Sequence, residues 1–305
     1  MNVGENVPLA PLTTFEIGGS AKYMVKARKD DDIHEAIQWA KDKGVRLVVL
    51  AGGSNVLVPD GGLDALVVRL VGNLYSVSDG TVDAWAGTNL LELIRALGAQ
   101  GYGGWEKLAG IPGTIGGAIR GNAGAFGPEI KDFVTSVRAL NAKTSDVRDF
   151  TNAECDFSYR HSFFKDHPEW IILRVQVRLA QADSAVLKSL AEETIAERER
   201  RHLQNVRAAG SFFMNPKAPR DIIAMFEKEK QTKSREGRVP AGWLIEKAGM
   251  KGASVGGAIA SLQHPNYIVN QGGATSHDVC NLAQLIKLEV ENQFGVELHE
   301  EAMIL

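Results

Sequence analysis

The sequence of 305 residues predicts an α+β fold arranged in three consecutive pieces. Three observations carry this prediction. Apolar and polar side chains alternate through residues 171–179, which is the period of a half-buried strand. Apolar side chains recur at helical spacing through residues 276–294. Between residues 30 and 70 a helical pattern comes first, and two short apolar runs follow with a glycine-rich loop between them.

The composition excludes several classes of protein. Apolar residues make up 44% of the chain and charged residues 23%, with a formal charge of −3, as is typical of globular proteins. No basic patch stands out, so we expect no nucleic-acid partner. The N-terminal residues lack the apolar segment of a secretory signal, and no apolar run reaches the roughly 18 residues of a membrane span. We therefore expect a cytoplasmic protein that does not contact a membrane.

The cysteines and histidines form no metal-binding pattern. Cys155 and Cys280 lie far apart, and none of the seven histidines belongs to an H-E-x-x-H motif or a Cys/His cluster. His161 and His264 are expected to make local hydrogen bonds. Two isolated cysteines also fit a reducing compartment. We therefore expect no metal site.

The first piece contains a helix that Asp30 can begin and Gly44 can end. A strand at 45–50 leads into the loop AGGSNVLV at 51–58, and a second strand covers 65–70. In this loop we expect Asn55 to take a left-handed backbone conformation and Ser54 to hydrogen-bond locally or to a ligand.

The second and third pieces follow from the same patterns. The second has strands at 81–86, 134–140, 147–150 and 171–179, a helix with inner residues Leu90, Leu91, Ile94 and Leu97, and a polar helix at 184–202. The third has helices over 216–230 and 240–248, and a last helix that Ser276 can cap. We expect these pieces to be domains at 1–72, 73–202 and 203–305.

The stretch LAGIPGTIGGAIRGNAGAFG at 108–127 needs a specific explanation. Seven of its twenty residues are glycine, and only Arg120 is charged. Glycine lets the backbone approach another molecule closely, at an entropic cost on folding. The segment therefore predicts a loop whose N–H groups point at an anion such as a nucleotide phosphate. A series of tight turns is the alternative.

Neither glycine-rich loop carries the G-x-G-x-x-G fingerprint of dinucleotide-binding folds, and no phosphate loop of the G-x-x-x-x-G-K-[ST] type occurs. An ATP or GTP hydrolase is therefore not expected. Two separate loops instead suggest an anionic nucleotide cofactor gripped between two subdomains.

Taken in order, the motifs along the chain resemble those of the UDP-N-acetylenolpyruvoylglucosamine reductases of bacterial peptidoglycan synthesis. The resemblance covers nearly the whole chain. Its motifs are TFEIGG at 14–19, GGSNVLV at 52–58, GIPGTIGG at 110–117, NAGAFG at 122–127, YRHS at 159–162, GSFFMNP at 210–216, AGWLIE at 241–246, KG at 251–252, IVN at 268–270 and ATSHD at 274–278.

This resemblance implies a two-subdomain FAD-binding fold of the vanillyl-alcohol-oxidase (PCMH) type, followed by a C-terminal α+β substrate domain. No histidine occurs between residues 45 and 64, so a non-covalent FAD is expected. The residues implied to hold the cofactor are Gly52, Gly53, Ser54, Asn55, Val56, Leu57, Gly113, Thr114, Gly116, Gly117, Asn122, Ala123 and Gly124.

The activity implied is reduction of UDP-N-acetylglucosamine enolpyruvate to UDP-N-acetylmuramate, with NADPH as reductant and FAD carrying the hydride. Ser211 matches the family's proton donor, and Arg160 matches an arginine whose planar fork suits a carboxylate gaining charge. Glu301 is the third expected catalytic residue. The family commonly ends in Leu-x-Pro-Glu, but this chain reads LHEE at 298–301, so Glu300 stays an alternative to Glu301.

Substrate contacts are expected from Tyr159, Asn215, Lys217 and Arg201, although solvated charges are an equally good interpretation of the basic residues. About fifty residues separate Arg160 from Ser211, which suggests the shorter subtype of the family. We expect a monomer. Two other functions stay open: a different flavin oxidoreductase of this fold acting on a hydroxy acid or alcohol, and a catalytically silent protein that binds a UDP-sugar or flavin.

Overall fold

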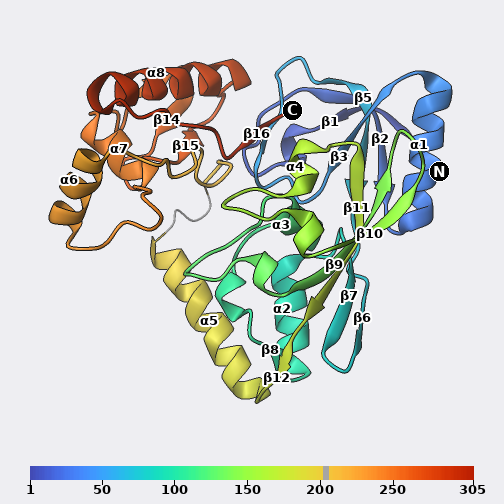
Figure 1. Ribbon diagram of the computed structural model, residues 1–305. Helices are drawn as coiled ribbons and strands as arrows, with labels where there is room; N and C mark the ends of the chain where they lie inside the picture. The colour runs from blue at the N-terminus through green and yellow to red at the C-terminus, as the bar shows by residue number, and fades with distance from the viewer. Residues whose placement is uncertain (202–205) are drawn as a thin grey trace. The chain divides into compact units, whose positions relative to one another are not determined.

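A computed structural model describes residues 1–201 and 206–305, apart from the side chain of Arg201 (Figure 1). Contacts between residues divide the chain into two compact units. The first unit comprises Met1–Val7, Ala21–Gly53 and Asp64–Arg201, and the second comprises Pro8–Ser20, Ser54–Leu63 and the described part of His202–Leu305. The division into three domains at residues 72 and 202 stays a prediction.

A four-stranded sheet in the first unit carries the first glycine-rich loop at the end of one strand. Its strand order is β1-β2-β5-β3, and β3 runs parallel to β5 with Arg46 opposite Ala65. Helix α1 precedes β3 and ends at Gly44, whose left-handed φ of 63° supplies the expected C-cap. The elements are β1 (Gly4–Pro8), β2 (Ser20–Ala27), α1 (Asp30–Lys43), β3 (Arg46–Leu50) and β5 (Leu63–Leu70).

A five-stranded antiparallel sheet, in the order β10-β9-β11-β7-β6, forms the rest of the framework of this unit. Helices α2 and α5 lie side by side, as Figure 1 shows. The predicted strands are all present within one or two residues. The elements are β6 (Tyr75–Ser78), β7 (Thr81–Trp85), α2 (Leu90–Ala99), β8 (Tyr102–Gly103), α3 (Ile115–Arg120), β9 (Val134–Asn141), β10 (Val147–Thr151), α4 (Phe163–Asp166), β11 (Trp170–Arg178), β12 (Ala180–Gln181) and α5 (Ser184–Arg201).

In the second unit, three helices accompany a small sheet in the order β13-β14-β15 (orange to red in Figure 1). The C-terminal strand β16 pairs in parallel with β4 of the first glycine-rich loop. The elements are β4 (Val56–Leu57), α6 (Arg220–Lys230), α7 (Ala241–Lys247), β13 (Ser254–Val255), β14 (Ala258–Ala260), β15 (Ile268–Asn270), α8 (Ser276–Phe294) and β16 (Met303–Ile304).

Three local predictions were wrong. Helix α6 begins at Arg220 rather than near Pro216, because residues 217 and 218 pair with the segment around Arg238. Thr275, not Ser276, caps α8: its hydroxyl accepts from the Asp278 N–H at 3.0 Å. In the first loop the left-handed residue is Gly53, with φ 68°, and Asn55 does not take a positive φ.

Two hydrophobic cores explain the division into units. The core of the first unit contains Trp85, Trp105 and Phe150. The core of the second unit contains Phe212 and Phe213, and the N-terminal residue Phe15 and the loop residue Leu57 are fully buried in it. Burial of such side chains stabilises the fold by roughly 2 kcal/mol each, which ties two short N-terminal segments to the C-terminal part.

Candidate active site

The two glycine-rich loops meet backbone to backbone in the first unit. A Cβ placed on Gly52 would fall 2.6 Å from the Cα of Gly113 and 3.3 Å from its carbonyl carbon. No side chain can occupy that space without moving one of the loops. The first loop follows β3, and the second precedes α3, so this contact brings together segments sixty residues apart. The glycines are therefore required for the loops to approach each other.

The N–H groups that start α3 are used within the protein. Ile115 N–H donates to Thr88 O and Gly116 N–H to Ala86 O, both at 2.9 Å. Gly117 N–H donates to the hydroxyl of Thr114, the N-cap, at 3.2 Å. The N–H groups of residues 115–117 are therefore already hydrogen-bonded within the protein.

The backbone N–H groups of Gly52 and Gly53, in the first glycine-rich loop, differ from those at the start of α3. Among the described residues of the first unit, no acceptor takes a hydrogen bond from the N–H of Gly52 or Gly53. Backbone N–H groups at a turn that make no hydrogen bond within the protein can bind an anionic ligand such as a pyrophosphate. The loop pair thus fits a nucleotide cofactor, with its polar contacts offered by Gly52 and Gly53 rather than by the start of α3.

The rest of the glycine-rich stretch is bound to the YRHS turn. The buried Asn122 takes a left-handed φ of 42°, and its amide donates to Ser158 O at 2.8 Å. The Ser162 hydroxyl donates to Arg120 O at 2.8 Å. Arg160 donates from Nη2 to Gly124 O at 3.2 Å. Alternate residues of one segment are thus fixed to the other, so Asn122 and Gly124 support the turn in addition to any contact with a cofactor.

Arg160 stands at the tip of this turn with its side chain held in place. Ser158 and His161 exchange backbone hydrogen bonds at 3.2 and 3.1 Å, which closes the turn around Tyr159 and Arg160. Arg160 has a φ of 57°, and its guanidinium lies 5.3 Å from the centre of the Tyr159 ring. A left-handed φ at a non-glycine residue costs energy, so the surrounding contacts must maintain it.

In the second unit, the segment that carries Ser211 pairs with the segment that carries Glu301. Phe213 forms an antiparallel bridge with Glu300, and Glu301 N–H donates to Phe212 O at 2.8 Å. Ser211 and Glu301 are thus joined through adjacent peptides, although ninety residues separate them in sequence. Among the described residues of the second unit, none makes a hydrogen bond with the Ser211 hydroxyl.

The first glycine-rich loop also contacts the C-terminal part in ways that the sequence did not reveal. The Asn55 amide donates to Glu301 O at 3.1 Å. The Asp60 carboxylate accepts from the Ser276 N–H at 2.7 Å and hydroxyl at 2.8 Å, at the start of α8. Burial raises the pKa of Asp60, but these bonds and one from His277 N–H lower it more, so the pKa lies below its ordinary value. No local pattern relates these residues, because they are more than two hundred positions apart.

The expected substrate-binding residues lie at different places. Asn215 accepts from Ala241 N–H at 3.0 Å through its side-chain oxygen, so it helps to begin α7. Lys217 is exposed, and Tyr159 lies in the turn described above. The side chain of Arg201 lies outside the described residues.

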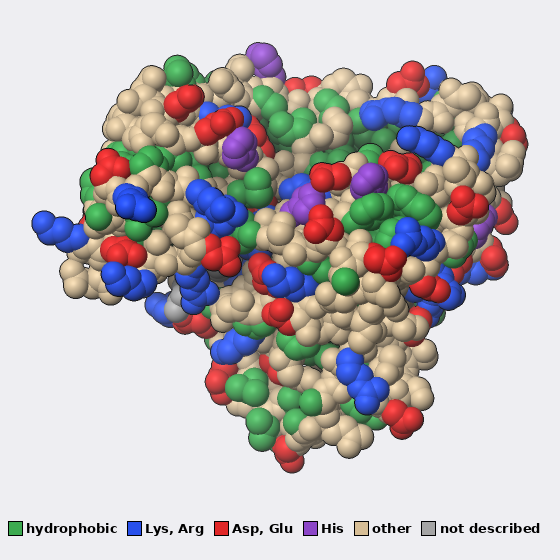
Figure 2. Space-filling model, in the orientation of Figure 1, with side chains coloured by type: hydrophobic (Ala, Val, Ile, Leu, Met, Phe, Trp, Pro, Cys, Tyr) green, Lys and Arg blue, Asp and Glu red, His purple; other side chains and the backbone are tan. Residues whose placement is uncertain are grey.

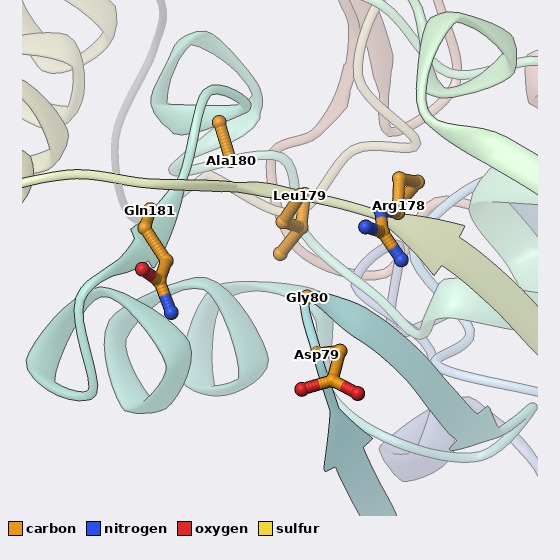
Figure 3. Close-up of a pocket in the computed structure, with 6 residues that line it drawn as sticks. All are labelled: Asp79, Gly80, Arg178, Leu179, Ala180 and Gln181. Carbon is orange, nitrogen blue, oxygen red and sulfur yellow. The ribbon is translucent and has the colours of Figure 1, made fainter.

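Other features give no further site. An open depression, shown in Figure 3, is lined by the turn at Asp79 and Gly80 and by the end of β11, and contains none of the expected site residues. Both cysteines are unbridged, and burial raises the pKa of Cys155 to about 12. No group of three or more His, Cys, Asp or Glu side chains could hold a metal ion in the described residues.

The surface and the helices give no sign of a nucleic-acid or membrane site in the described residues. On the face shown in Figure 2, basic and acidic side chains are interspersed. Within the described parts of the chain, none of the helices combines the length and apolar character needed to cross a membrane.

Comparisons with known proteins cover nearly the whole chain. Residues 21–149 match the family described as an FAD binding domain, and residues 201–305 match the family described as UDP-N-acetylenolpyruvoylglucosamine reductase, C-terminal domain. A UDP-N-acetylenolpyruvoylglucosamine reductase of Solibacter usitatus is 35% identical over 302 residues, covering 98% of this chain and 95% of that protein. Its counterpart from Myxococcus xanthus is 36% identical, covering 96% of this chain and 89% of that protein.

A solved structure supports the same relationship. The crystal structure of UDP-N-acetylenolpyruvylglucosamine reductase from Thermus caldophilus superposes with a TM-score of 0.78 at 30% identity, covering 100% of this chain and 99% of that one. Together with the FAD-binding match, this confirms the predicted α+β fold: an FAD-binding domain followed by the C-terminal domain of the reductase family.

Proposed function

This chain belongs to the UDP-N-acetylenolpyruvoylglucosamine reductase family, and we propose on that premise that it reduces UDP-N-acetylglucosamine enolpyruvate to UDP-N-acetylmuramate with NADPH. The observation that carries the proposal is the pairing of the Ser211 and Glu301 segments in the second unit, which brings together two of the three expected catalytic residues.

FAD suits the two glycine-rich loops, and when bound there it would supply hydride, taken from NADPH, to the β-carbon of the enolpyruvyl group. Gly52 and Gly53 would offer their N–H groups to its pyrophosphate, and Ser54, Asn55, Val56 and Leu57 continue the same loop. Gly113, Thr114, Gly116 and Gly117 of the second loop, followed by Asn122, Ala123 and Gly124, would complete the cofactor site, since the second loop approaches Gly52 through Gly113.

The chain's own residues manage the charge and the proton. Addition of hydride to the β-carbon leaves an electron pair at the α-carbon that spreads into the neighbouring carboxylate. Arg160 stabilises that charge with its guanidinium, whose planar fork matches a carboxylate. Ser211 donates its hydroxyl proton to the α-carbon and regains a proton from solvent. Glu301 acts near the same carboxylate and helps to polarise it.

Binding of the UDP diphosphate falls to Lys217, Arg201 and Asn215, with Tyr159 beside Arg160. Cationic and amide groups suit two phosphates. We propose that the protein acts as a monomer in the cytoplasm. These finer points rest on family membership and on residue type.

The experiment uses purified protein loaded with FAD. Mixing it with NADPH without oxygen should bleach the flavin absorbance, and adding the enolpyruvyl UDP-sugar should restore it. UDP-N-acetylglucosamine, which lacks the enol ether, is the control and should restore nothing. Recovery of colour at equal rates with both sugars, or a colourless protein that takes up no FAD, would contradict the proposal.

A further inference from the structure

The peptide of Glu301 is held from both sides. Its N–H donates to Phe212 O at 2.8 Å, and its carbonyl oxygen accepts from the Asn55 side-chain amide at 3.1 Å. The first bond fixes Glu301 relative to the residue next to Ser211. The second fixes it relative to the loop expected to hold the cofactor. Glu301 is therefore bonded both to the segment that carries Ser211 and to the loop expected to hold the cofactor.

The main chain of Asn55 continues this attachment. Asn55 O accepts from Met303 N–H at 3.0 Å, and Leu305 N–H donates to Leu57 O at 3.1 Å. Strands β4 and β16 run parallel between these bonds, with Met303 opposite Val56. A ladder of two residue pairs is weak by itself. The register of the β4–β16 pair therefore depends on the hydrogen bonds at its ends. One of these bonds is made by the Asn55 side chain, which donates to Glu301 O.

Asn55 is exposed, so hydrophobic packing does not explain its position. Its amide nitrogen donates to the carbonyl of the residue whose carboxyl group is expected to act on the substrate. We propose that Asn55 is a positioning residue, which sets the Glu301 peptide relative to the cofactor loop and so aligns the carboxyl group with the reacting atoms. The catalytic consequence rests on the proposed function, whereas the attachment of the C-terminal segment does not.

Asn55→Asp is the informative change. The aspartate keeps the size of the side chain but replaces the donating amide with a carboxylate oxygen, which repels the Glu301 carbonyl. Asn292→Asp is the matched control, because Asn292 is an exposed asparagine on α8 and its replacement adds the same charge to the second unit.

Hydrogen exchange in the FAD-free protein tests the attachment. We expect the amides of Glu301 and Met303 to exchange about tenfold faster in Asn55→Asp than in the unaltered protein, as loss of one hydrogen bond allows. Amides in the middle of α8 should not change, and Asn292→Asp should match the unaltered protein. Unchanged exchange at residues 301–303 in Asn55→Asp would overturn the proposal.

Half-reactions at saturating FAD test the catalytic consequence. In Asn55→Asp, reduction of the flavin by NADPH should proceed at the normal rate, and its reoxidation by the enolpyruvyl UDP-sugar should be about tenfold slower. A variant that loses FAD affinity but, once loaded, reoxidises normally would show that Asn55 serves the cofactor alone, and would overturn the proposal. If the unaltered protein fails to use the sugar, the proposed function fails, and the exchange result still decides the attachment.

Discussion

Lys287 donates hydrogen bonds to both carboxylate oxygens of Glu300, at 3.1 and 3.4 Å. Lys287 lies on α8, so Glu300 is engaged with a helix of its own unit. Glu301 follows Glu300 at a bend of the chain, where the N–H groups of Glu301 and Ala302 both donate to Phe212 O. Because Glu300 is engaged in this way, we keep Glu301 as the expected carboxyl group at the substrate, with Glu300 as the alternative.

The two glutamates should respond differently to removal of charge. Glu301→Gln should slow reduction of the enolpyruvyl UDP-sugar by about a hundredfold, since general acid and hydrogen-bonding groups contribute on that order. Glu300→Gln should keep the activity and lose only the stability of a partly exposed ion pair, about 0.5 kcal/mol. Steady-state rates and urea unfolding of both variants distinguish the two residues, and the reverse order of activities would assign the role to Glu300.

Ser211→Ala should separate the two halves of the reaction. NADPH should still bleach the bound flavin, because this step needs no proton from Ser211. Return of colour on adding the enolpyruvyl UDP-sugar should slow by about 10²–10⁴-fold, the usual contribution of a positioned proton donor. Stopped-flow absorbance measures both steps. Ser211→Cys keeps a proton donor and should recover part of the rate; slow bleaching in Ser211→Ala would instead point to a structural role or an NADPH contact.

Arg160→Lys should weaken the same half-reaction while keeping the positive charge. The ammonium group cannot form the planar pair of hydrogen bonds that a guanidinium offers, and it loses the bond to Gly124 O. We expect reoxidation by the sugar to slow roughly tenfold to a hundredfold, with normal bleaching by NADPH. Rapid-mixing absorbance provides the test, and an unchanged reoxidation rate would exclude Arg160 from the reaction.

Gly52→Ala should damage cofactor binding through sterics alone. The added Cβ would fall 2.6 Å from Gly113 Cα, and forcing the loops apart should cost roughly 1–3 kcal/mol. FAD affinity should fall correspondingly, by about fivefold or more. Gly61→Ala is the matched control, because a Cβ there meets nothing within 4 Å. Flavin fluorescence titration measures the FAD affinity, and thermal unfolding measures the stability. Equal FAD affinities for the two variants would show that the contact between Gly52 and Gly113 is not needed for cofactor binding.

Asp60→Asn should remove a contribution to stability that depends on pH in a defined direction. The pKa of Asp60 is lowered below its ordinary value of 3.8, so the stabilising contribution is present above that pH and is lost as the pH falls through the folded-state pKa. At neutral pH the variant should be less stable by about 1 kcal/mol, because a carboxylate at the start of α8 is replaced by a neutral group. Urea unfolding across the acidic range checks this, and a difference that persists in strong acid would point to a cause other than charge.

The sequence by itself determined the local elements and the family. Period-two alternation predicted β11, and helical spacing predicted α8, because burying one face of an element imposes a pattern on neighbouring positions. The glycine content of 108–127 indicated close backbone approach, and the motifs carried the family resemblance that the comparisons confirm. Element ends were less certain, since Thr275 and Ser276 are both suitable caps and only geometry selects one.

Only the tertiary structure decided which distant residues meet. Gly52 touches Gly113, Asn55 donates to Glu301 O, and Asp60 accepts from Ser276. The residues of each pair are far apart in the sequence, and no periodic pattern of side chains relates them. The contact of Lys287 with Glu300 is of this kind, because the sequence shows only two adjacent carboxyl groups and the fold places Lys287 beside one of them. The chemistry of a side chain follows from its residue type. The residue that it meets depends on how the hydrophobic cores bring separate segments together.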